Sequence, residues 1–327
     1  MVAGACVVAV ALADLLSTTL SVASATGVVS VRAARLVWGG VQRLRLSHRA
    51  LRMVGPTIVA GQIAWWVLAL WAGWALVFLG AGADAVISTS TGAPTSGADR
   101  VYYAGYLVAT LGNGDFGPTS TTWQIASVLA SLSGLLTATL AITFVVPVVS
   151  AVVERRRLAM QIASLGGSPQ ALLERSWNGS DFAALTPHLS STVLPAVHMT
   201  AQQHLAYPVL HYFHNDQRQA AIAPMIAALD DALLVLRHGL RDPGIDGLTL
   251  EATRRAIDDL LALMRSAYVE PADDPPPPPD RQALARLGAA MADEAAFARA
   301  VDADADRRRV LRGFVETDGW SWSDVHG

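Results

Sequence analysis

Long apolar runs fill the first half of the chain, whereas the second half alternates apolar and charged positions. Three runs have the length of membrane spans, and we place them at residues 1–28, 57–80 and 123–153. At 1.5 Å per residue the run 57–80 extends roughly 36 Å as a helix, which exceeds the ~30 Å hydrocarbon core of a bilayer. The pattern therefore predicts three transmembrane helices, followed by a polar region after Arg157.

The interval between the second and third runs has its own pattern. Residues 81–100 are rich in small and polar residues, which is typical of an extracellular loop. Residues 101–110 predict a short helix that contains Tyr102, Tyr103 and Tyr106. The segment Thr110-Leu111-Gly112-Asn113-Gly114-Asp115 follows, with two glycines spaced two apart. Glycine adopts positive φ without steric penalty, so this spacing suits a loop that presents consecutive carbonyl oxygens.

A span, a short helix, a glycine-spaced loop and another span resemble, in this order, the pore module of the potassium channel superfamily. In such a module, rings of backbone carbonyls replace the hydration shell of the permeant ion. Paired aromatics early in the short helix and a proline after the aspartate, here Pro118, also match the family pattern. The resemblance covers roughly residues 57 to 150.

The resemblance implies a role for each matching residue. Residues 110–114 would form the selectivity filter, mainly through their carbonyls, and Asp115 would set the charge of the outer mouth. The pore helix would aim its negative end at the ion path. The remaining matches are the supporting Tyr102, Tyr103 and Tyr106 and the inner-helix bending positions Gly134 and Pro147.

The filter segment departs from the family pattern at two positions. Leu111 replaces a valine and Asn113 replaces a tyrosine that braces the filter in the family. Asn113 keeps open a weakly selective or non-selective cation channel, and a separate alternative is a non-conducting membrane sensor or scaffold whose pore module is vestigial. The expectation is a passive cation channel that conducts K⁺ without a cofactor. One pore segment cannot enclose a path, so the family geometry implies a homotetramer.

Charge determines the predicted orientation. Residues 29–56 form a basic connector, and arginines also end the third run at residues 155–157. The positive-inside rule places both clusters in the cytoplasm, with the N-terminus outside and the C-terminus inside the plasma membrane. Contact with lipid headgroups is the simplest role for the connector arginines, which are Arg32, Arg35, Arg43, Arg45, Arg49 and Arg52.

Composition excludes several classes of function. The net charge of −3 disfavours nucleic-acid binding. The single cysteine, Cys6, allows neither an intrachain disulfide nor a multi-cysteine metal site. The chain lacks the serine-hydrolase and zinc-protease motifs, so we predict no enzyme and no metal site. The adjacent pairs Asp230-Asp231 and Asp258-Asp259 suggest solvated helix faces.

Polar residues in unusual places allow more than one interpretation. Asp14 lies within the first span. It either contacts the next span or takes part in gating, or it is a buried acid that is bonded to nearby hydroxyls or simply protonated, and we favour the buried acid. His204, His211 and His214 have spacings that would place them on one helix face. They form either a pH or metal sensor or, as we favour, part of a packed amphipathic helix.

The second half predicts an all-α cytoplasmic domain at residues 154–270, so the fold class is an all-α membrane protein with a re-entrant pore helix and filter loop. Its ligand or partner is not indicated. Pro275 to Pro279 form a stiff linker before a tail, so residues 271–327 are predicted to lie apart from that domain. Helical patterns occur at residues 168–177, 195–214, 217–238, 249–268 and 281–299.

Overall fold

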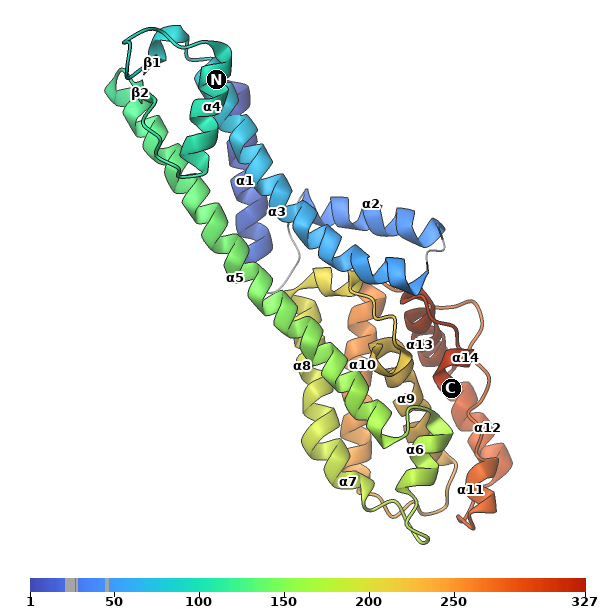
Figure 1. The fold of residues 1–327 in the computed structure, drawn as a ribbon. Coiled ribbons are helices and arrows are strands. Elements are labelled where there is room, and N and C mark those ends of the chain that lie inside the picture. Colours follow the sequence, from blue (N-terminus) through green and yellow to red (C-terminus); the bar gives the residue numbers. More distant parts are fainter. Residues whose placement is uncertain (21–26, 28, 45–46) are drawn as a thin grey trace. The chain divides into compact units, whose positions relative to one another are not determined.

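The computed structural model describes residues 1–20, 27, 29–44 and 47–327, and it divides into two compact units. The first unit comprises residues 1–39 and 56–148, and the second comprises residues 40–55 and 149–327. Part of the predicted first span and Arg45 of the basic connector lie outside the described residues. Figure 1 labels the elements along the chain.

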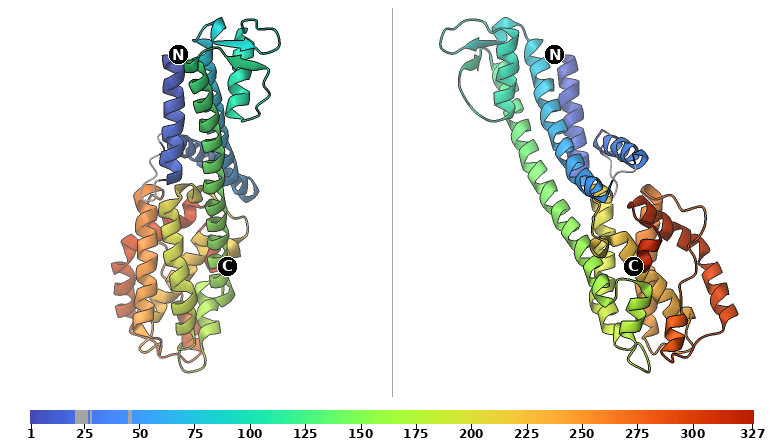
Figure 2. Two further views of the ribbon diagram at one scale, coloured as in Figure 1. Left: turned by 90° about the vertical axis from the view of Figure 1, so that its left-hand side faces the viewer. Right: turned by 45° about the vertical axis from the view of Figure 1, so that its right-hand side comes forward.

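Three helices are long and apolar enough to cross a membrane, namely α1 (Val2–Leu20), α3 (His48–Leu79) and α5 (Thr121–Leu165). In the first unit α1 runs alongside α3, as both views of Figure 2 show. A Cβ atom on Gly4 would lie 2.5 Å from the carbonyl oxygen of Gly73, so only glycine permits this close crossing. Small residues at such contacts are typical of packed membrane helices.

The short helix α4 (Gly97–Val108) begins and ends earlier than the predicted 101–110. Ser96 and Asp99 form a capping box, which satisfies backbone N–H groups of the first turn and so fixes the start. Phe78 of α3 packs edge-on against Tyr103 of α4, with ring centroids 5.0 Å apart. Both side chains are fully buried, so α4 is held on the first unit by its aromatic face.

The tryptophans of α3 divide between two environments. Trp66 and Trp74 are buried, whereas Trp65 and Trp71 are 38% and 40% exposed. The sequence left open whether these rings pack on a neighbouring helix or lie at the lipid boundary. The Trp71 indole also donates a 3.0 Å hydrogen bond to the Val101 carbonyl of α4, so packing on neighbouring helices is observed for both buried rings and for Trp71, and a lipid-boundary position stays a prediction for Trp65.

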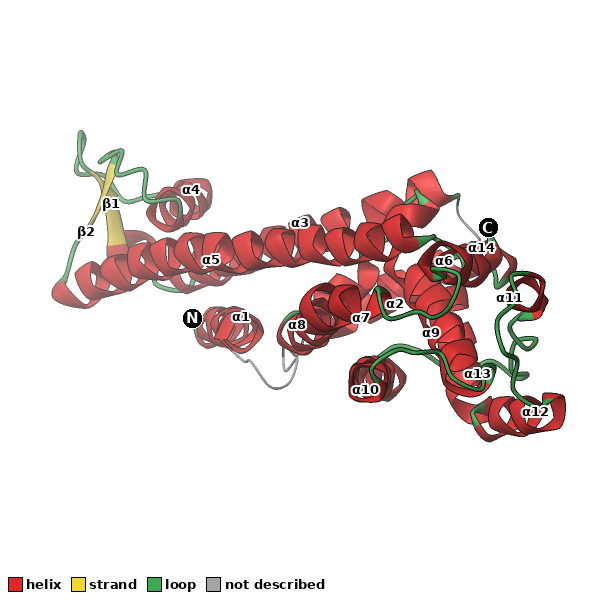
Figure 3. Ribbon diagram, turned by 90° about the horizontal axis from the view of Figure 1, so that it is seen from below, coloured by secondary structure: helices red, strands yellow, loops and turns green. Residues whose placement is uncertain are grey.

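Two short strands flank α4 and were not expected from the sequence. β1 (Val86–Ser88) and β2 (Phe116–Pro118) form an antiparallel pair, drawn in yellow in Figure 3. Ile87 pairs with Gly117 in this register. The pairing joins the segment before α4 to the end of the glycine-spaced loop.

Several boundaries differ from the sequence predictions because helices extend through polar stretches. α3 begins at His48, so Pro56 lies inside the helix rather than at its start. α5 continues to Leu165, beyond the arginines expected to end it. The basic connector contains a further helix, α2 (Ser30–Arg43).

The second unit is built around α9 (Ile222–His238), in which every residue from Ile222 to Leu236 is buried. α10 (Gly247–Ala267) and the C-terminal part of α5 contribute to the same core. The other elements are α6 (Pro169–Ser176), α7 (Leu185–His188), η2 (Leu189–Val193), α8 (Leu194–Ala206), η3 (Pro208–Tyr212), η4 (Arg218–Ala220), α11 (Gln282–Arg286), α12 (Glu294–Ala303), α13 (Ala305–Thr317) and α14 (Ser323–His326). A short 3-10 helix, η1 (Ala83–Ala85), belongs to the first unit.

The predicted separation of residues 271–327 as a linker and tail is wrong. Leu284, Phe297 and Leu311 join the same apolar core as α9. The proline run is also held, because Arg308 donates a 2.8 Å hydrogen bond to the carbonyl oxygen of Pro277. The run therefore connects two parts of one unit.

Candidate functional site

The glycine-spaced loop follows the end of α4 and has an alternating backbone. Thr110, Gly112 and Gly114 adopt positive φ values of 55°, 63° and 78°. The left-handed conformation thus recurs at every second residue, which is the repeat needed for consecutive carbonyls to share one side. Positive φ was expected for the glycines but not for Thr110, because a side chain makes this region unfavourable.

The loop is not covered by its own chain. Residues 109–115 are all exposed, and the Leu111 side chain is 64% exposed. No described atom lies within 4 Å of the Cβ positions that Gly112 and Gly114 would have. Non-helical backbone at membrane depth is tolerated only where it lines water or is buried in protein. The loop therefore requires a surface beyond this single chain, or water.

Hydrogen bonds connect the loop to α4. The Asn113 side-chain amide donates to the Tyr102 hydroxyl at 2.5 Å, and that hydroxyl donates to the Asp115 carboxylate at 3.2 Å. The Tyr106 hydroxyl donates to the carbonyl oxygen of Phe116 at 2.7 Å. The structure thus brings Tyr102, Asn113 and Asp115 together in one chain of contacts, hereafter the Tyr102 brace.

Two further contacts hold this region and were missed from the sequence. The Thr89 hydroxyl donates to the carbonyl oxygens of Gly114 and Asp115 at 2.6 and 3.0 Å. The Tyr103 hydroxyl lies 2.5 Å from the Ser127 hydroxyl of α5. The β1–β2 pairing places Thr89 beside the loop, and no local sequence motif predicts that pairing.

Gly134 is a contact point between α5 and α4. A Cβ atom there would overlap the carbonyl oxygen of Val108, so the two helices touch where α4 ends. α5 is continuous through both Gly134 and Pro147. A bending role for these two residues therefore stays a prediction, whereas close packing of Gly134 is observed.

A cavity of about 760 Å³ lies in the first unit beside the loop. Its lining is mostly apolar and comes from α3, α4 and α5, with Thr110 and Thr137 among the few polar residues. The cavity reaches the first residue of the glycine-spaced loop and the contact at Gly134. The end of α4 is therefore the point where loop, cavity and α5 meet.

Asp14 contacts the next span as well as a hydroxyl. Its carboxylate accepts bonds from the Val29 and Ser30 amides at 2.9 and 3.2 Å and from the Ser30 hydroxyl. The Trp66 indole of α3 donates to it at 3.0 Å. The favoured interpretation from the sequence omitted this indole. Asp14 therefore joins α1, the start of α2 and α3 within the first unit.

The predicted histidine face is wrong, because α8 ends at Ala206 and η3 begins at Pro208. His204 and His211 are buried, whereas His214 contacts His48 instead. Burial, together with the nearby positive charge of Arg155, lowers the pKa of His211 to about 3 and that of His204 well below its ordinary value. Neither takes up a proton near neutral pH. Within the described ranges, no three metal-ligating side chains converge.

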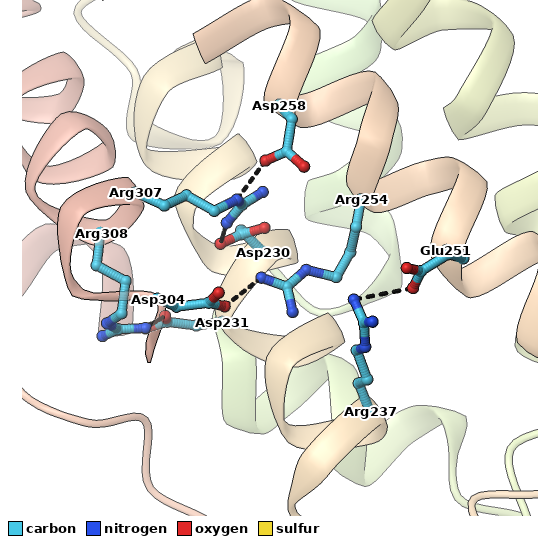
Figure 4. A network of polar contacts seen from close by, with 9 residues as sticks. All are labelled: Asp230, Asp231, Arg237, Glu251, Arg254, Asp258, Asp304, Arg307 and Arg308. Carbon is cyan, nitrogen blue, oxygen red and sulfur yellow. Dashed lines mark hydrogen bonds and ion pairs between the residues drawn. The ribbon is translucent and has the colours of Figure 1, made fainter. Parts of the chain in front are cut away.

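The solvated face predicted for Asp230 and Asp231 is also wrong, because both are fully buried. Figure 4 shows their partners: Arg307 bonds Asp230 and Asp258, and Arg308 bonds Asp231. Burial opposes ionisation of both carboxyls. At Asp230 the charge of Arg307 prevails and lowers the pKa, whereas at Asp231 burial prevails and raises the pKa to about 7.

Comparisons with known proteins agree with the pore-like arrangement of the first unit. A family model described as "Ion channel" matches residues 64–151, which include α4, the glycine-spaced loop and most of α5. Over 324 residues the chain is 30% identical to "Uncharacterized membrane protein YdjJ" of Bacillus subtilis (strain 168), covering 98% of this chain and 94% of the relative. The chain therefore belongs to the same family as this Bacillus subtilis membrane protein. It is a membrane protein of the ion channel superfamily, and no solved structure matches it.

Proposed function

We propose that the protein is a homotetrameric, passive cation channel whose filter is formed by the carbonyls of residues 110–114. The observation that carries this proposal is the left-handed backbone at Thr110, Gly112 and Gly114 in an exposed loop. Four copies around one axis would supply the missing surface and close a ring of oxygens around an ion. Such conduction needs the permeant ion alone, so neither a cofactor nor catalysis is involved.

The orientation follows from charge and from the path of α1. We place the N-terminus outside and the second unit in the cytoplasm of the cell, with the connector arginines against lipid headgroups. Met1 lies against Gly80 at the end of α3 that leads into the β1–α4 segment, which supports an N-terminus on the side of the filter. The second unit would then be a regulatory domain attached to the cytoplasmic end of α5.

We propose K⁺ as the permeant ion. The Tyr102 brace supports selectivity, because it ties Asn113 and Asp115 to α4 although the family tyrosine is absent. A weakly selective channel is the alternative, since the Asn113 side chain is shorter than a tyrosine and its bond goes to the exposed Tyr102 hydroxyl. Asp115 at the outer mouth would attract cations in either case.

The deciding experiment is the reversal potential of the purified protein in planar bilayers, with K⁺ on one side and Na⁺ on the other. We expect reversal near the K⁺ equilibrium potential. Reversal near zero with clear current would favour the non-selective alternative, and Asn113→Tyr would then restore selectivity.

Two glycine variants test the filter assignment itself. Gly112→Ala places a side chain at positive φ, which costs roughly 1–2 kcal/mol and distorts the carbonyl repeat, so conduction should be lost. Gly61→Ala is the control, because no described atom lies within 4 Å of the added Cβ on α3. Equal currents from both variants would contradict the filter. A tetramer that passes no current under any condition would favour the scaffold.

A further inference from the structure

The first two turns of α3 belong to the second unit, although the helix continues from Pro56 into the first. Residues 48–55 pack there against two short segments, near His214 and near Trp320. A Cβ on Gly55 would lie 2.7 Å from the Phe213 ring, and the Leu51 side chain abuts Gly319. Arg52 pairs with Asp216 at 2.9 Å. We call residues 48–55 the α3 anchor.

His48 begins the α3 anchor and faces His214 through ring nitrogens. His48 Nδ1 and His214 Nε2 are 2.9 Å apart, so one proton is shared between them. The other ring nitrogen of His214, Nδ1, is buried and lies 3.5 Å from the Asp318 carboxylate. The His48 ring also stacks on Trp320, with centroids 4.4 Å apart.

The geometry of the His48–His214 contact limits how many protons the two rings can carry while they stay hydrogen-bonded. When His48 donates from Nδ1 and His214 accepts at Nε2, the single ring proton of neutral His214 lies on Nδ1 and points toward Asp318. One added proton is tolerated, because His48 can take it at Nε2 and still donate from Nδ1. A further proton has to occupy His214 Nε2, and two N–H groups then face each other at 2.9 Å. The hydrogen bond is lost and two positive charges repel.

The charged groups around the pair set how readily that proton is taken up. Asp318 faces His214, and the Asp324 carboxylate of α14 is within electrostatic range of His48. Arg155 of α5 opposes protonation, and it lines a cavity of about 40 Å³ together with His214 and Asp318. That volume accommodates water, which gives protons a route to the buried ring. Arg156 lines the same cavity, Arg52 pairs with Asp216, and Arg218 donates to the carbonyls of Gly167 and Asp324.

We propose that the His48–His214 contact is an acid-sensitive latch that holds the α3 anchor on the second unit and releases it when both rings are protonated. Because α3 is one continuous helix, release frees the N-terminal end of the outer helix of the pore unit. Two interacting histidines take up protons as a pair, so the release belongs to the second of two protonation steps. Its effect on current rests on the proposed channel function, whereas release itself does not.

The test is amide hydrogen exchange of residues 48–55 in the full chain, measured by mass spectrometry at pH 7.5 and pH 5 and corrected for intrinsic exchange. We expect protection to fall by about tenfold or more in acid, which corresponds to about 1.4 kcal/mol. His48→Gln keeps a donor toward His214 but cannot become charged, so its acid response should be about twofold or less. His198→Gln, on the exposed face of α8, is the matched control and should respond like the natural chain.

Asp318→Asn provides a second variant that leaves both histidines in place. Loss of the carboxylate removes the charge that favours protonated His214, so the acid transition should move to lower pH. The latch is disproved if His48→Gln keeps the full acid response or if Asp318→Asn leaves the transition where it was. An anchor that exchanges equally at both pH values in the natural chain disproves it as well. None of these results depends on ion conduction, so failure of the latch and failure of the channel are distinguishable.

Discussion

The glycine-spaced loop and the charge network of α9 and α13 both carry concentrated polar groups, but they present them in opposite ways. The loop exposes its backbone over consecutive residues and derives its shape from φ angles at three of them. The network buries side chains that come from distant segments, and Asp231 and Arg308 are completely covered. The loop therefore depends on its local backbone conformation, whereas the network depends on ion-pair partners from other helices.

This difference predicts which substitutions each site tolerates. In the loop, Leu111 and Asn113 are exposed, so the type of side chain matters less than a Cβ at a left-handed position. In the network, loss of one partner strands a buried charge, whose desolvation is then uncompensated. The loop should therefore fail in function and the network in stability.

The largest expected effect comes from Arg308→Leu. Above the pKa of Asp231, removal of its partner from the buried ion pair costs about 3–5 kcal/mol, because the remaining carboxylate stays buried without a partner. We expect this loss in the unfolding free energy of the second unit, measured from hydrogen exchange of α9 amides in the full chain. Arg312→Leu on the same helix removes a partly exposed pair with Glu316 and a 3.3 Å hydrogen bond to the carbonyl oxygen of Asp274, and it should cost about 1 kcal/mol or less. Similar costs for both would remove the contrast between buried and exposed charge.

The same network should make the second unit pH-dependent. Burial raises the pKa of Asp231 to about 7, above its unfolded value near 3.9. A raised folded pKa contributes stability that is complete below the unfolded value and is lost as pH rises through the folded one. Protection of α9 amides should therefore decline from pH 5 to pH 7.5 in the natural chain and stay flatter in Asp231→Asn. The lowered pKa of Asp230 acts only below this window.

Gly134→Ala should have the next effect and separates packing from bending. The added methyl would collide with the Val108 carbonyl, and overpacking of this kind costs about 1–3 kcal/mol. Exchange of the last α4 amides should rise together with loss of current. A pure hinge role would instead change the open probability and leave α4 protected. Gly61→Ala on α3, with open space around it, controls for helix propensity.

The contrast between the two sites also explains what the sequence could predict. The loop was located from a six-residue motif because conformation there depends on the glycines themselves, and Gly112 and Gly114 adopt the expected positive φ. Local order also predicted the helices on either side. The exact start of α4 was missed because the capping box at Ser96 lies within the small, polar residues before it.

The Asp231–Arg308 and His48–His214 contacts could not be predicted from the sequence, because the two residues of each contact are far apart in the chain. Asp231 and Arg308 are separated by 77 positions and His48 and His214 by 166. A signal existed for Asp231, since the helix around it is apolar on every face until Arg237. Side chains at adjacent helix positions point in different directions. On a helix that is buried on all sides, such as α9, both side chains still contact protein. Charges in such a helix predict buried partners rather than solvent.

The smallest expected effect concerns the Tyr102 brace, through which the loop contacts a side chain of α4. Tyr102→Phe removes bonds to Asn113 and Asp115, each with a net contribution of about 0.5–1.5 kcal/mol, and the exposure of the loop keeps the loss near the lower value. Stability should hardly change, whereas the K⁺ to Na⁺ permeability ratio from reversal potentials should fall. Tyr106→Phe, which loses only a bond to the Phe116 carbonyl outside the filter, should preserve the ratio. If Tyr102→Phe also preserves it, the backbone maintains the filter without this brace, and the loop then differs from the α9 network even more sharply, because its function would not depend on a side-chain partner in α4.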